Sequence, residues 1–323
     1  MALSTPDLIP PPHAPAFLAA QGWPGATILP LAGDASFRRY FRVRDGARGA
    51  VLMDAPPQHE DSRPFLAMAA HLDAIGFRAP RILAHDLAAG LILIEDFGDL
   101  RMAEAVADRP EHEVDTYRAA IDLIRALHAH PAAATIGRYD DAVYRREAAL
   151  FPDWYAPAVG LDVDVEGYHD AWTAVLGRLD REPVVTVLRD YHAENIMLLE
   201  DGDLGLLDFQ DALAGHPAYD VVSLLQDARR EVSPELETAM LAHYGPIDGT
   251  AYAILGAQRN AKILGIFTRL WKRDGKNRYL AYQPRVWRYL ERDLAHPALA
   301  EVRGWFDMHV PTRMRAAYWA TPA

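Results

Sequence analysis

One pattern in the middle of the chain constrains the fold more than any other feature. It begins at Asp190 and Asn195, continues through two short apolar segments separated by residues 200–203, and ends at Asp208. The separating residues read Glu-Asp-Gly-Asp, and an Asp-Gly pair between apolar runs is a strong signal for a tight turn between antiparallel strands. The pattern therefore predicts a short β-hairpin with polar side chains at its open end.

The register of this hairpin decides which side chains meet. If residues 200–203 form the turn, Leu199 pairs with Leu204, and the same register sets Asn195 opposite Asp208. Directly opposed residues share one face of the ribbon, with Cβ atoms about 4.5–5.5 Å apart. Two oxygen-bearing side chains at that separation are suited to one Mg²⁺ ion, which takes few protein ligands and completes its shell with waters and phosphates.

The loop before the hairpin adds a third polar group. Asp190 lies five residues before Asn195, so its carboxylate is expected near the same point without binding the metal. This layout is typical of phosphoryl transfer, in which metal ions bridge the phosphates and a separate Asp orients the acceptor hydroxyl. Each residue alone is better interpreted as an ordinary turn or cap residue. The joint pattern favours Asp190 as catalytic base, with Asn195 and Asp208 as metal ligands.

The rest of the chain changes from strand-rich to helix-rich around this pattern. Short apolar runs at 50–53 and 91–94 end at turn or connector residues, which predicts strands. From Asp115 onward apolar residues recur at helical spacing, with Asp115 or Thr116 as the expected N-cap. Everything after Tyr219 is predicted to be helical.

Composition excludes several classes of function. The chain has 323 residues, half of them hydrophobic, which suffices for one large core or two smaller ones with a cleft between them. Its formal net charge of −12 argues against binding to nucleic acid or to an anionic membrane. It has no cysteine, which excludes disulfides and thiolate chemistry. With no signal peptide and no apolar run of about 20 residues, we expect a cytoplasmic protein.

The central motif resembles the protein-kinase-like superfamily, in its aminoglycoside and choline phosphotransferase branch. This resemblance implies an α+β, two-lobed fold: a strand-rich N-lobe, residues 1–98, that covers the nucleotide, and a mainly helical C-lobe, residues 99–323, that carries the catalytic and substrate groups. It also implies ATP and Mg²⁺ as cofactors. Leu188 stands where the family has a histidine that supports the catalytic loop. We expect His192, two residues after the base, to take over that support on the substrate side of the loop.

A closer resemblance extends from residue 33 to about residue 290. The stretches that carry it, in order, are 33–42, 53–57, 189–192, 207–212 and 219–225. They are similar to the family of anomeric kinases that act on N-acetylmuramate and N-acetylglucosamine. That family works in cell-wall sugar recycling and makes the sugar 1-phosphate, so the resemblance implies a small sugar as the acceptor.

On the nucleotide side, the family folds a glycine-rich hairpin over the phosphates. The corresponding stretch here contains Gly33 and Ser36, whose backbone amides are candidates for phosphate contacts. Met53 occupies the position of the family's third-strand lysine, so Arg38 or Arg42 is expected to supply the missing charge. The alternative is an ordinary strand–turn–strand with solvent-facing arginines.

Two further features belong to the nucleotide side. Glu60 is a candidate partner acid on the helix that follows. Residues 95–98 resemble the hinge between lobes, where backbone groups near Glu95 and Phe97 are expected to pair with the adenine edge.

On the acceptor side, Asp153 and Trp154 lie in a proline-bounded aromatic cluster. Sugar rings pack their C–H faces on aromatics, and an Asp can bind hydroxyls. The alternative is that Trp154 and Tyr155 fill a helix interface. Arg229 and the adjacent Arg230 are candidates for binding the lactyl carboxylate of N-acetylmuramate.

A basic stripe on a later helix has two interpretations. Arg259, Lys262, Arg269 and Arg273 share one helical face. Such a stripe is usually a solvated face, and that interpretation is favoured here. The alternative is attraction of an anionic substrate.

Two competing functions remain. A kinase of the same fold for another alcohol, of the choline or aminoglycoside type, would need an acidic, aromatic pocket for a cation. A non-catalytic nucleotide-binding protein is suggested by the missing lysine and by Leu188. The presence of Asp190, Asn195 and Asp208 together disfavours the second.

Overall fold

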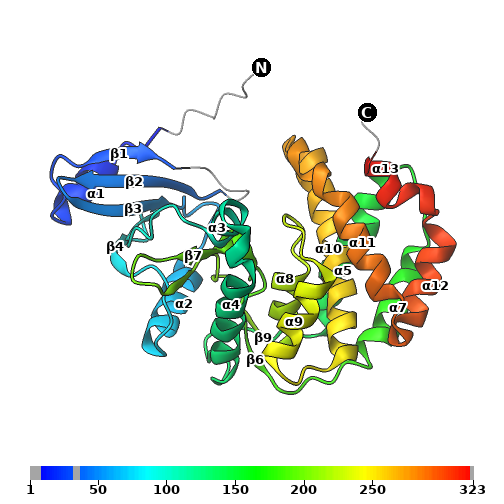
Figure 1. The fold of residues 1–323 in the computed structure, drawn as a ribbon. Coiled ribbons are helices and arrows are strands. Elements are labelled where there is room, and N and C mark those ends of the chain that lie inside the picture. The colour runs from blue at the N-terminus through cyan, green and yellow to red at the C-terminus, as the bar shows by residue number, and fades with distance from the viewer. Residues whose placement is uncertain (1–8, 32–36, 321–323) are drawn as a thin grey trace. The chain divides into compact units, whose positions relative to one another are not determined.

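The computed structural model describes residues 9–31 and 37–320 of the chain. Contacts divide the chain into two compact units. The N-terminal unit comprises Met1–Arg101 with Ile196–Asp211, and the C-terminal unit comprises Met102–Asn195 with Ala212–Ala323. The predicted α+β architecture, with a sheet in the first part and helices in the second, is confirmed (Figure 1).

The N-terminal unit is built on a five-stranded antiparallel sheet with the strand order β1-β2-β3-β5-β4. Both predicted strands are present, as β3 and β5. The elements of this part are β1 (Thr27–Pro30), β2 (Arg39–Asp45), β3 (Arg48–Asp54), β4 (Ile82–Asp86), β5 (Leu91–Ile94), α1 (Ala14–Ala20) and α2 (Arg63–Ala74).

Side-chain alternation gives this sheet two different faces. Leu18 of α1 packs with Phe41, Leu52 and Leu93 in a buried apolar cluster on one face. Met53 is paired with Tyr40 across β2 and β3. Both residues are adjacent in sequence to members of that cluster, so their side chains point to the other face. The position of the family's lysine therefore lies on the face of the sheet opposite to α1.

The predicted hairpin is present in the N-terminal unit, as β7 (Ile196–Leu198) and β8 (Leu204–Leu206). It joins the rest of that unit through backbone hydrogen bonds: the Leu198 N–H donates to the Leu100 carbonyl, and the Leu206 N–H donates to the Arg78 carbonyl, each at 2.8 Å. Asp208, two residues beyond β8, is thus anchored to the sheet-bearing unit.

The predicted register of the hairpin is wrong by one residue. Leu198, not Leu199, pairs with Leu204. The turn is longer than expected, because the Leu199 N–H donates to the Asp203 carbonyl at 2.9 Å and Gly202 takes a φ of 90° inside the loop. The ladder ends at Ile196, so the expected strand pairing of Asn195 with Asp208 does not form.

The C-terminal unit is mainly helical, and the predicted helices after Tyr219 are confirmed. Its helices are α3 (Met102–Asp108), α4 (Glu113–His128), α5 (Asp141–Ala148), α6 (Ala156–Ala158), α7 (Val165–Leu176), α8 (Ala218–Leu225), α9 (Pro234–Tyr244), α10 (Gly249–Asp274), α11 (Gln283–Leu294), α12 (Ala300–His309) and α13 (Ala316–Ala320). The short elements are β6 (Val185–Val187), β9 (Leu213–Gly215), the π-helix η2 (Phe151–Tyr155), and the 3₁₀ helices η1 (Pro110–His112), η3 (Ala193–Asn195), η4 (Asn277–Tyr282), η5 (Pro297–Leu299) and η6 (Thr312–Met314).

One predicted helix boundary is wrong. Helix α4 begins at Glu113 with His112 at the N-cap, so neither Asp115 nor Thr116 caps it. Both predicted cap residues lie within the first turn of the helix, where an Asp still interacts favourably with the helix dipole.

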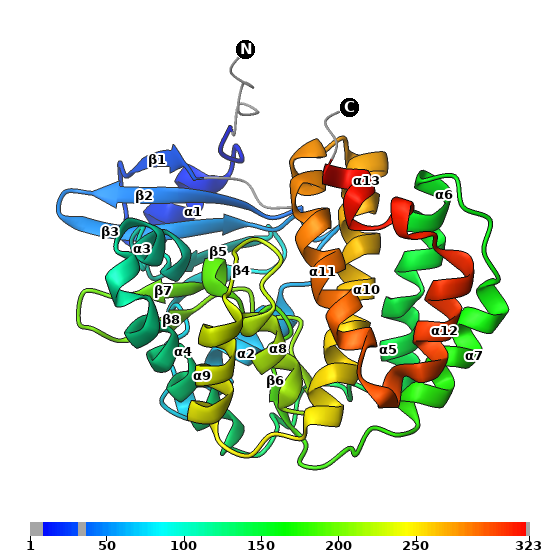
Figure 2. The ribbon, with the colours of Figure 1, turned by 45° about the vertical axis from the view of Figure 1, so that its right-hand side comes forward.

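Helix α10 runs through the middle of the C-terminal unit, against α5, α8 and α11 (Figure 2). The Asp248 side chain caps its start by accepting the N–H groups of Thr250 and Ala251, and Gly275 in the left-handed conformation ends it. Among the described residues, no helix combines the length and apolar character needed to cross a membrane.

The basic stripe on α10 is not a solvated face, and that expectation is wrong for its first half. Arg259 and Lys262 are 3% and 7% exposed. Neighbouring helices surround this part of α10, so the side chains of every face are enclosed. Only towards the C-terminal end does the stripe reach solvent, where Arg269 is half-buried and Arg273 is exposed.

Candidate active site

The loop that carries Asp190 lies between β6 and η3 in the C-terminal unit. The backbone N–H groups of Leu188 and Arg189 both donate to the carboxylate of Asp220, at 2.7 and 2.8 Å. Arg189 adopts a left-handed conformation with φ of 72°, which is uncommon for a residue with a side chain. The Asp220 carboxylate therefore holds the turn immediately before the predicted base.

Asp220 does not cap α8, although it lies near the start of that helix. Pro217 occupies the N-cap, and Asp220 is fully buried in the first turn with its side chain directed at the loop. The sequence contained a usable signal, because an acid within the apolar run 219–225 must find partners when it is buried.

The amide of Asn195 is oriented by the same loop. Its Nδ2 atom donates to the carbonyl oxygen of Asp190 at 2.9 Å and lies 3.4 Å from Nε2 of His192. Since the nitrogen is held by this carbonyl, the Oδ1 atom of Asn195 points the other way. Asn195 thus presents a neutral oxygen of the kind that Mg²⁺ accepts as a ligand.

His192 is buried between Asn195 and Arg229. Nη1 of Arg229 lies 3.0 Å from its Nε2 atom. Burial, together with the positive charge of Arg229, lowers the pKa of His192 to about 3. The ring is therefore neutral at physiological pH and accepts the arginine's hydrogen bond. Its position fits the support role expected from the sequence.

Arg229 is held by acids on two sides. Its Nε atom is 3.1 Å from a carboxylate oxygen of Glu194, and its backbone N–H donates to the carboxylate of Asp227 at 2.8 Å. Burial alone would lower the pKa of Arg229, but Asp227, Glu194 and Asp190 raise it above its ordinary value. The side chain is still 24% exposed, so a substrate anion can reach it.

The two candidates in the aromatic cluster lie on η2. Asp153 is exposed and Trp154 is half-buried, so both remain accessible from the surface. Tyr155 is fully buried, and its hydroxyl donates to the Met314 carbonyl at 2.6 Å while it accepts the indole N–H of Trp287. The interface-filling alternative is therefore confirmed for Tyr155.

In the N-terminal unit, Asp208 follows the hairpin in a left-handed conformation with φ of 59°. Its Oδ1 atom accepts a hydrogen bond from Nε2 of Gln210 at 2.7 Å. A non-glycine residue in this conformation is sterically costly, and such residues are concentrated at functional sites. The carboxylate is a hard oxygen donor suited to Mg²⁺.

Arg38 lies close to this carboxylate. It is only 8% exposed, and its Nη2 atom is 3.3 Å from Glu60. Burial would lower the pKa of Arg38, but the Tyr40 hydroxyl and the carboxylates of Glu60, Asp208 and Asp211 raise it. The predicted partnership of Glu60 is confirmed, although Glu60 precedes α2 instead of lying on it.

Arg42 faces the connector at the end of β5. Its guanidinium is 2.9 Å from Asp96 and 2.8 Å from Asp99. Hydrogen bonding to Asp99 is the largest influence that raises its pKa. Arg42 thus holds the connector 95–98 in place, whereas Arg38 is the arginine beside Asp208.

The remaining predicted nucleotide contacts are only partly described. The Glu95 N–H donates to the Arg81 carbonyl at 2.9 Å, and its carboxylate is 3.0 Å from Arg81 and 3.3 Å from Arg78. The Phe97 ring packs so closely on Gly205 that a Cβ there would lie 2.6 Å from it. Gly33 and Ser36 lie outside the described residues.

Comparison with known proteins now identifies the class. Residues 27–255 match the model of the Phosphotransferase enzyme family, so the chain belongs to this family of small-molecule kinases. It is 38% identical to the N-acetylmuramate/N-acetylglucosamine kinase of Caulobacter vibrioides, over 93% of this chain and 96% of the relative. It is 40% identical to the protein of the same name from Pseudomonas aeruginosa, over 89% and 91% of the two chains.

The fold agrees with this assignment. A choline/ethanolamine kinase family protein from Mesorhizobium loti superposes with a TM-score of 0.63 and 18% identity, covering 90% of this chain and 98% of the other. The resemblance to the aminoglycoside and choline phosphotransferase branch, inferred from the central motif, is therefore confirmed.

Proposed function

We propose that this protein is an ATP-dependent kinase that phosphorylates the anomeric hydroxyl of N-acetylmuramate and N-acetylglucosamine. The observation that carries the proposal is the oriented loop 188–195, together with relatives of that name that match most of the chain. The product would be a sugar 1-phosphate that enters cell-wall recycling. Use of ATP, and the absence of cysteine, favour the cytoplasm as its location.

The catalytic base in this proposal is Asp190. Its carboxylate accepts the proton of the sugar hydroxyl as the oxygen bonds to the γ-phosphorus, while the bond from that phosphorus to the bridging oxygen of ADP breaks. When bound, Mg²⁺ would supply positive charge that offsets the charge of the phosphates. Asn195 and Asp208 are the residues proposed to hold it, because each offers an oxygen of the type that the ion prefers.

The nucleotide is proposed to contact the N-terminal unit, with the lobe boundary at residue 98. Arg38 is proposed to replace the family's third-strand lysine. It is buried beside Asp208 and paired with Glu60, which is the setting that a phosphate-binding cation needs. The backbone amides of Gly33 and Ser36 are proposed to contact the phosphates, and Arg42 is proposed to hold the connector. The carbonyl of Glu95 and the backbone of Phe97 are proposed to meet the adenine.

The acceptor sugar is proposed to contact the C-terminal unit. Arg229 is suited to the lactyl carboxylate of N-acetylmuramate because it is partly exposed and contacts His192 and Glu194 of the loop that carries Asp190. When the sugar lacks this carboxylate, Glu194 keeps the arginine neutralised, so both sugars are compatible with the site. Trp154 and Asp153 are proposed to contact the ring face and hydroxyls, and His192 to orient Arg229.

The test measures ADP release with N-acetylmuramate, N-acetylglucosamine, choline and kanamycin, with phosphorus NMR of the product. We expect turnover with the two amino sugars and a phosphate on the anomeric carbon. Asp208→Ala should abolish turnover, whereas Asp203→Ala, an exposed acid on the same hairpin, should retain it. Turnover with choline or kanamycin alone, or a phosphate elsewhere on the sugar, would overturn the proposal.

A further inference from the structure

A group of buried charged side chains contacts the loop 188–195 through Arg189. None of these side chains is among the proposed substrate or metal contacts. Glu147 of α5 is the centre of the group. The Glu147 carboxylate is paired with the guanidinium of Arg189, accepts the hydroxyl of Tyr139, and lies 3.2 Å from Nζ of Lys262. Nζ of Lys262 is also 3.3 Å from the hydroxyl of Tyr219. We refer to Glu147, Arg189, Lys262, Tyr139 and Tyr219 as the loop-support cluster.

The cluster is deeply enclosed and joins distant parts of the chain. Glu147 and Lys262 are each 7% exposed and Tyr139 is 3% exposed. The contributing residues come from α5, α8, α10, the segment before α5 and the catalytic loop. Buried charges are expensive unless they are paired and hydrogen-bonded, so this arrangement has few alternative geometries.

Arg189 connects the cluster to the base. It immediately precedes Asp190, and its left-handed backbone is held by Asp220. The Arg189 carbonyl also accepts the hydroxyl of Ser223 at 3.2 Å. The backbone and the side chain of Arg189 are therefore both held, and this fixes the backbone conformation immediately before Asp190.

The charges of the cluster are complementary to the base. Arg189 and Lys262 are two cations around one anion, which leaves one positive charge in excess. The carboxylate of Asp190 is among the groups that raise the pKa of both cations, against the lowering effect of their burial. Asp190 is therefore close enough to supply the balancing negative charge.

We propose that Glu147 and Lys262 are positioning residues for catalysis, which hold Arg189 so that Asp190 keeps a productive orientation. Together with His192, they support a loop in which Leu188 stands at the family's histidine position. The inference rests on the proposed role of Asp190 as base. A displacement of about 1 Å in a catalytic group can reduce turnover on the order of 10²-fold.

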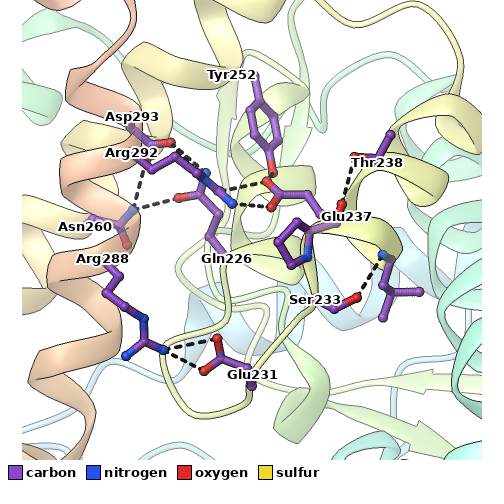
Figure 3. Close-up of polar contacts among 12 residues, drawn as sticks. Gln226, Glu231, Ser233, Glu237, Thr238, Tyr252, Asn260, Arg288, Arg292 and Asp293 are labelled. Atoms are coloured by element: carbon purple, nitrogen blue, oxygen red, sulfur yellow. Dashed lines mark hydrogen bonds and ion pairs between the residues drawn. The ribbon is translucent and has the colours of Figure 1, made fainter.

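The test compares Glu147→Gln, Lys262→Met and Tyr139→Phe with a matched control. The control is Glu237→Gln, because Glu237 is similarly buried and accepts a tyrosine hydroxyl, from Tyr252, at 2.6 Å. Its partners come from α10 and α11 instead of the catalytic loop (Figure 3). Turnover and the KM values for ATP and sugar are measured on the folded fraction of each variant.

We expect Glu147→Gln to lower kcat on the order of 10²-fold with both KM values nearly unchanged, since the binding groups are untouched. Lys262→Met should have a smaller effect, because Arg189 keeps its carboxylate partner, and Tyr139→Phe the smallest. Glu237→Gln should keep the wild-type kcat. Equal kcat values for Glu147→Gln and Glu237→Gln would overturn the inference, as would a loss of Glu147→Gln activity that appears only in KM.

A second readout separates this inference from the proposed function. Hydrogen exchange of a peptide covering 188–195 should be faster in Glu147→Gln than in wild type, and unchanged in Glu237→Gln. This measurement needs no substrate. Tyr139→Phe loses only a hydroxyl and is expected to fold normally, and it should also show faster exchange of this peptide, so poor folding of Glu147→Gln would not explain the result. Unchanged loop exchange in both Glu147→Gln and Tyr139→Phe would overturn the inference even if the sugar kinase activity is established.

Discussion

Glu147 and Glu237 are two buried carboxylates of the C-terminal unit that share two kinds of partner. Each accepts a tyrosine hydroxyl and each is paired with an arginine, Arg189 in one case and Arg292 in the other. The difference lies in where the arginine is located. Arg292 is on the regular helix α11, whereas Arg189 is on the left-handed turn before Asp190. A tyrosine–carboxylate–arginine arrangement therefore joins helices at Glu237, whereas at Glu147 it holds the turn before the proposed base.

The two regions also differ in how their charges are balanced. Burial raises the pKa of Glu147, but Lys262, Arg189 and the Tyr139 hydroxyl outweigh it, and the net pKa lies below its ordinary value. Near Glu237, Asp293 is bonded to the amides of Gln226 and Asn260 at 3.0 and 3.1 Å (Figure 3). Burial raises the pKa of Asp293 to about 8, despite the opposing effects of Arg292 and these amides. Glu147 is therefore ionised at neutral pH, whereas Asp293 titrates near neutrality.

The largest expected effect is at Asp190, the proposed base. Asp190→Ala should lower kcat by about 10²–10⁴-fold, the usual contribution of general base catalysis. Coupled ADP detection measures this loss, with the exposed Asp170→Ala of α7 as the control. This loss of kcat is the upper limit for the loss expected from any variant of the loop-support cluster, because the cluster is proposed to act through Asp190. A Glu147→Gln effect larger than that of Asp190→Ala would contradict an action through the base.

The next effect concerns stability. Glu147→Gln should lose about 3–5 kcal/mol of unfolding free energy, because it leaves Lys262 buried without its carboxylate and Arg189 without its main partner. Glu237→Gln should lose less, because its partner Arg292 is exposed to solvent. Urea denaturation of both variants measures the two losses. A loss for Glu237→Gln as large as that for Glu147→Gln would contradict this difference in burial.

A third effect is the dependence of stability on pH. Between about pH 4 and pH 8, folded Asp293 keeps a proton that the unfolded chain has released, so wild-type stability falls as pH rises. Asp293→Asn should remove this term and gain about 1.4 kcal/mol per pH unit relative to wild type inside that window. Urea denaturation at pH 5, 6 and 7 tests it.

The same pH series sharpens the comparison. Glu147 has a lowered pKa and is ionised throughout the window, so Glu147→Gln should differ from wild type by a constant amount. Parallel curves for Asp293→Asn and wild type would show that Asp293 does not hold its proton in the folded state.

The smallest effect is expected on the substrate side of the loop. Arg229→Lys keeps the charge but loses the planar fork, and should raise the KM for N-acetylmuramate by about tenfold, or ~1.4 kcal/mol. The KM for N-acetylglucosamine, which lacks the lactyl carboxylate, should change little. Equal increases for both sugars would assign Arg229 to loop support, together with His192 and Glu194, instead of substrate selection.

Local patterns were a good guide to the elements and to the residues of the central motif. Strands β3 and β5, the hairpin and the helices after Tyr219 all follow from apolar spacing and turn residues, because these signals act over a few neighbouring residues. The hairpin register was missed by one residue, since an Asp-Gly turn is compatible with more than one loop length. The face taken by Lys262 was also missed, because helical spacing does not reveal that other helices enclose α10.

The amino-acid sequence by itself determined the kinase-like class, through the order of Asp190, Asn195, the hairpin and Asp208. Only the tertiary structure decided what supports Asp190, because Glu147, Lys262 and Asp220 lie far from it in the chain and are brought to it by the packing of α5, α10 and α8. A buried ion is costly unless it has a partner. Glu147 and Asp220 find theirs in Arg189 and in the backbone N–H groups of the loop before Asp190.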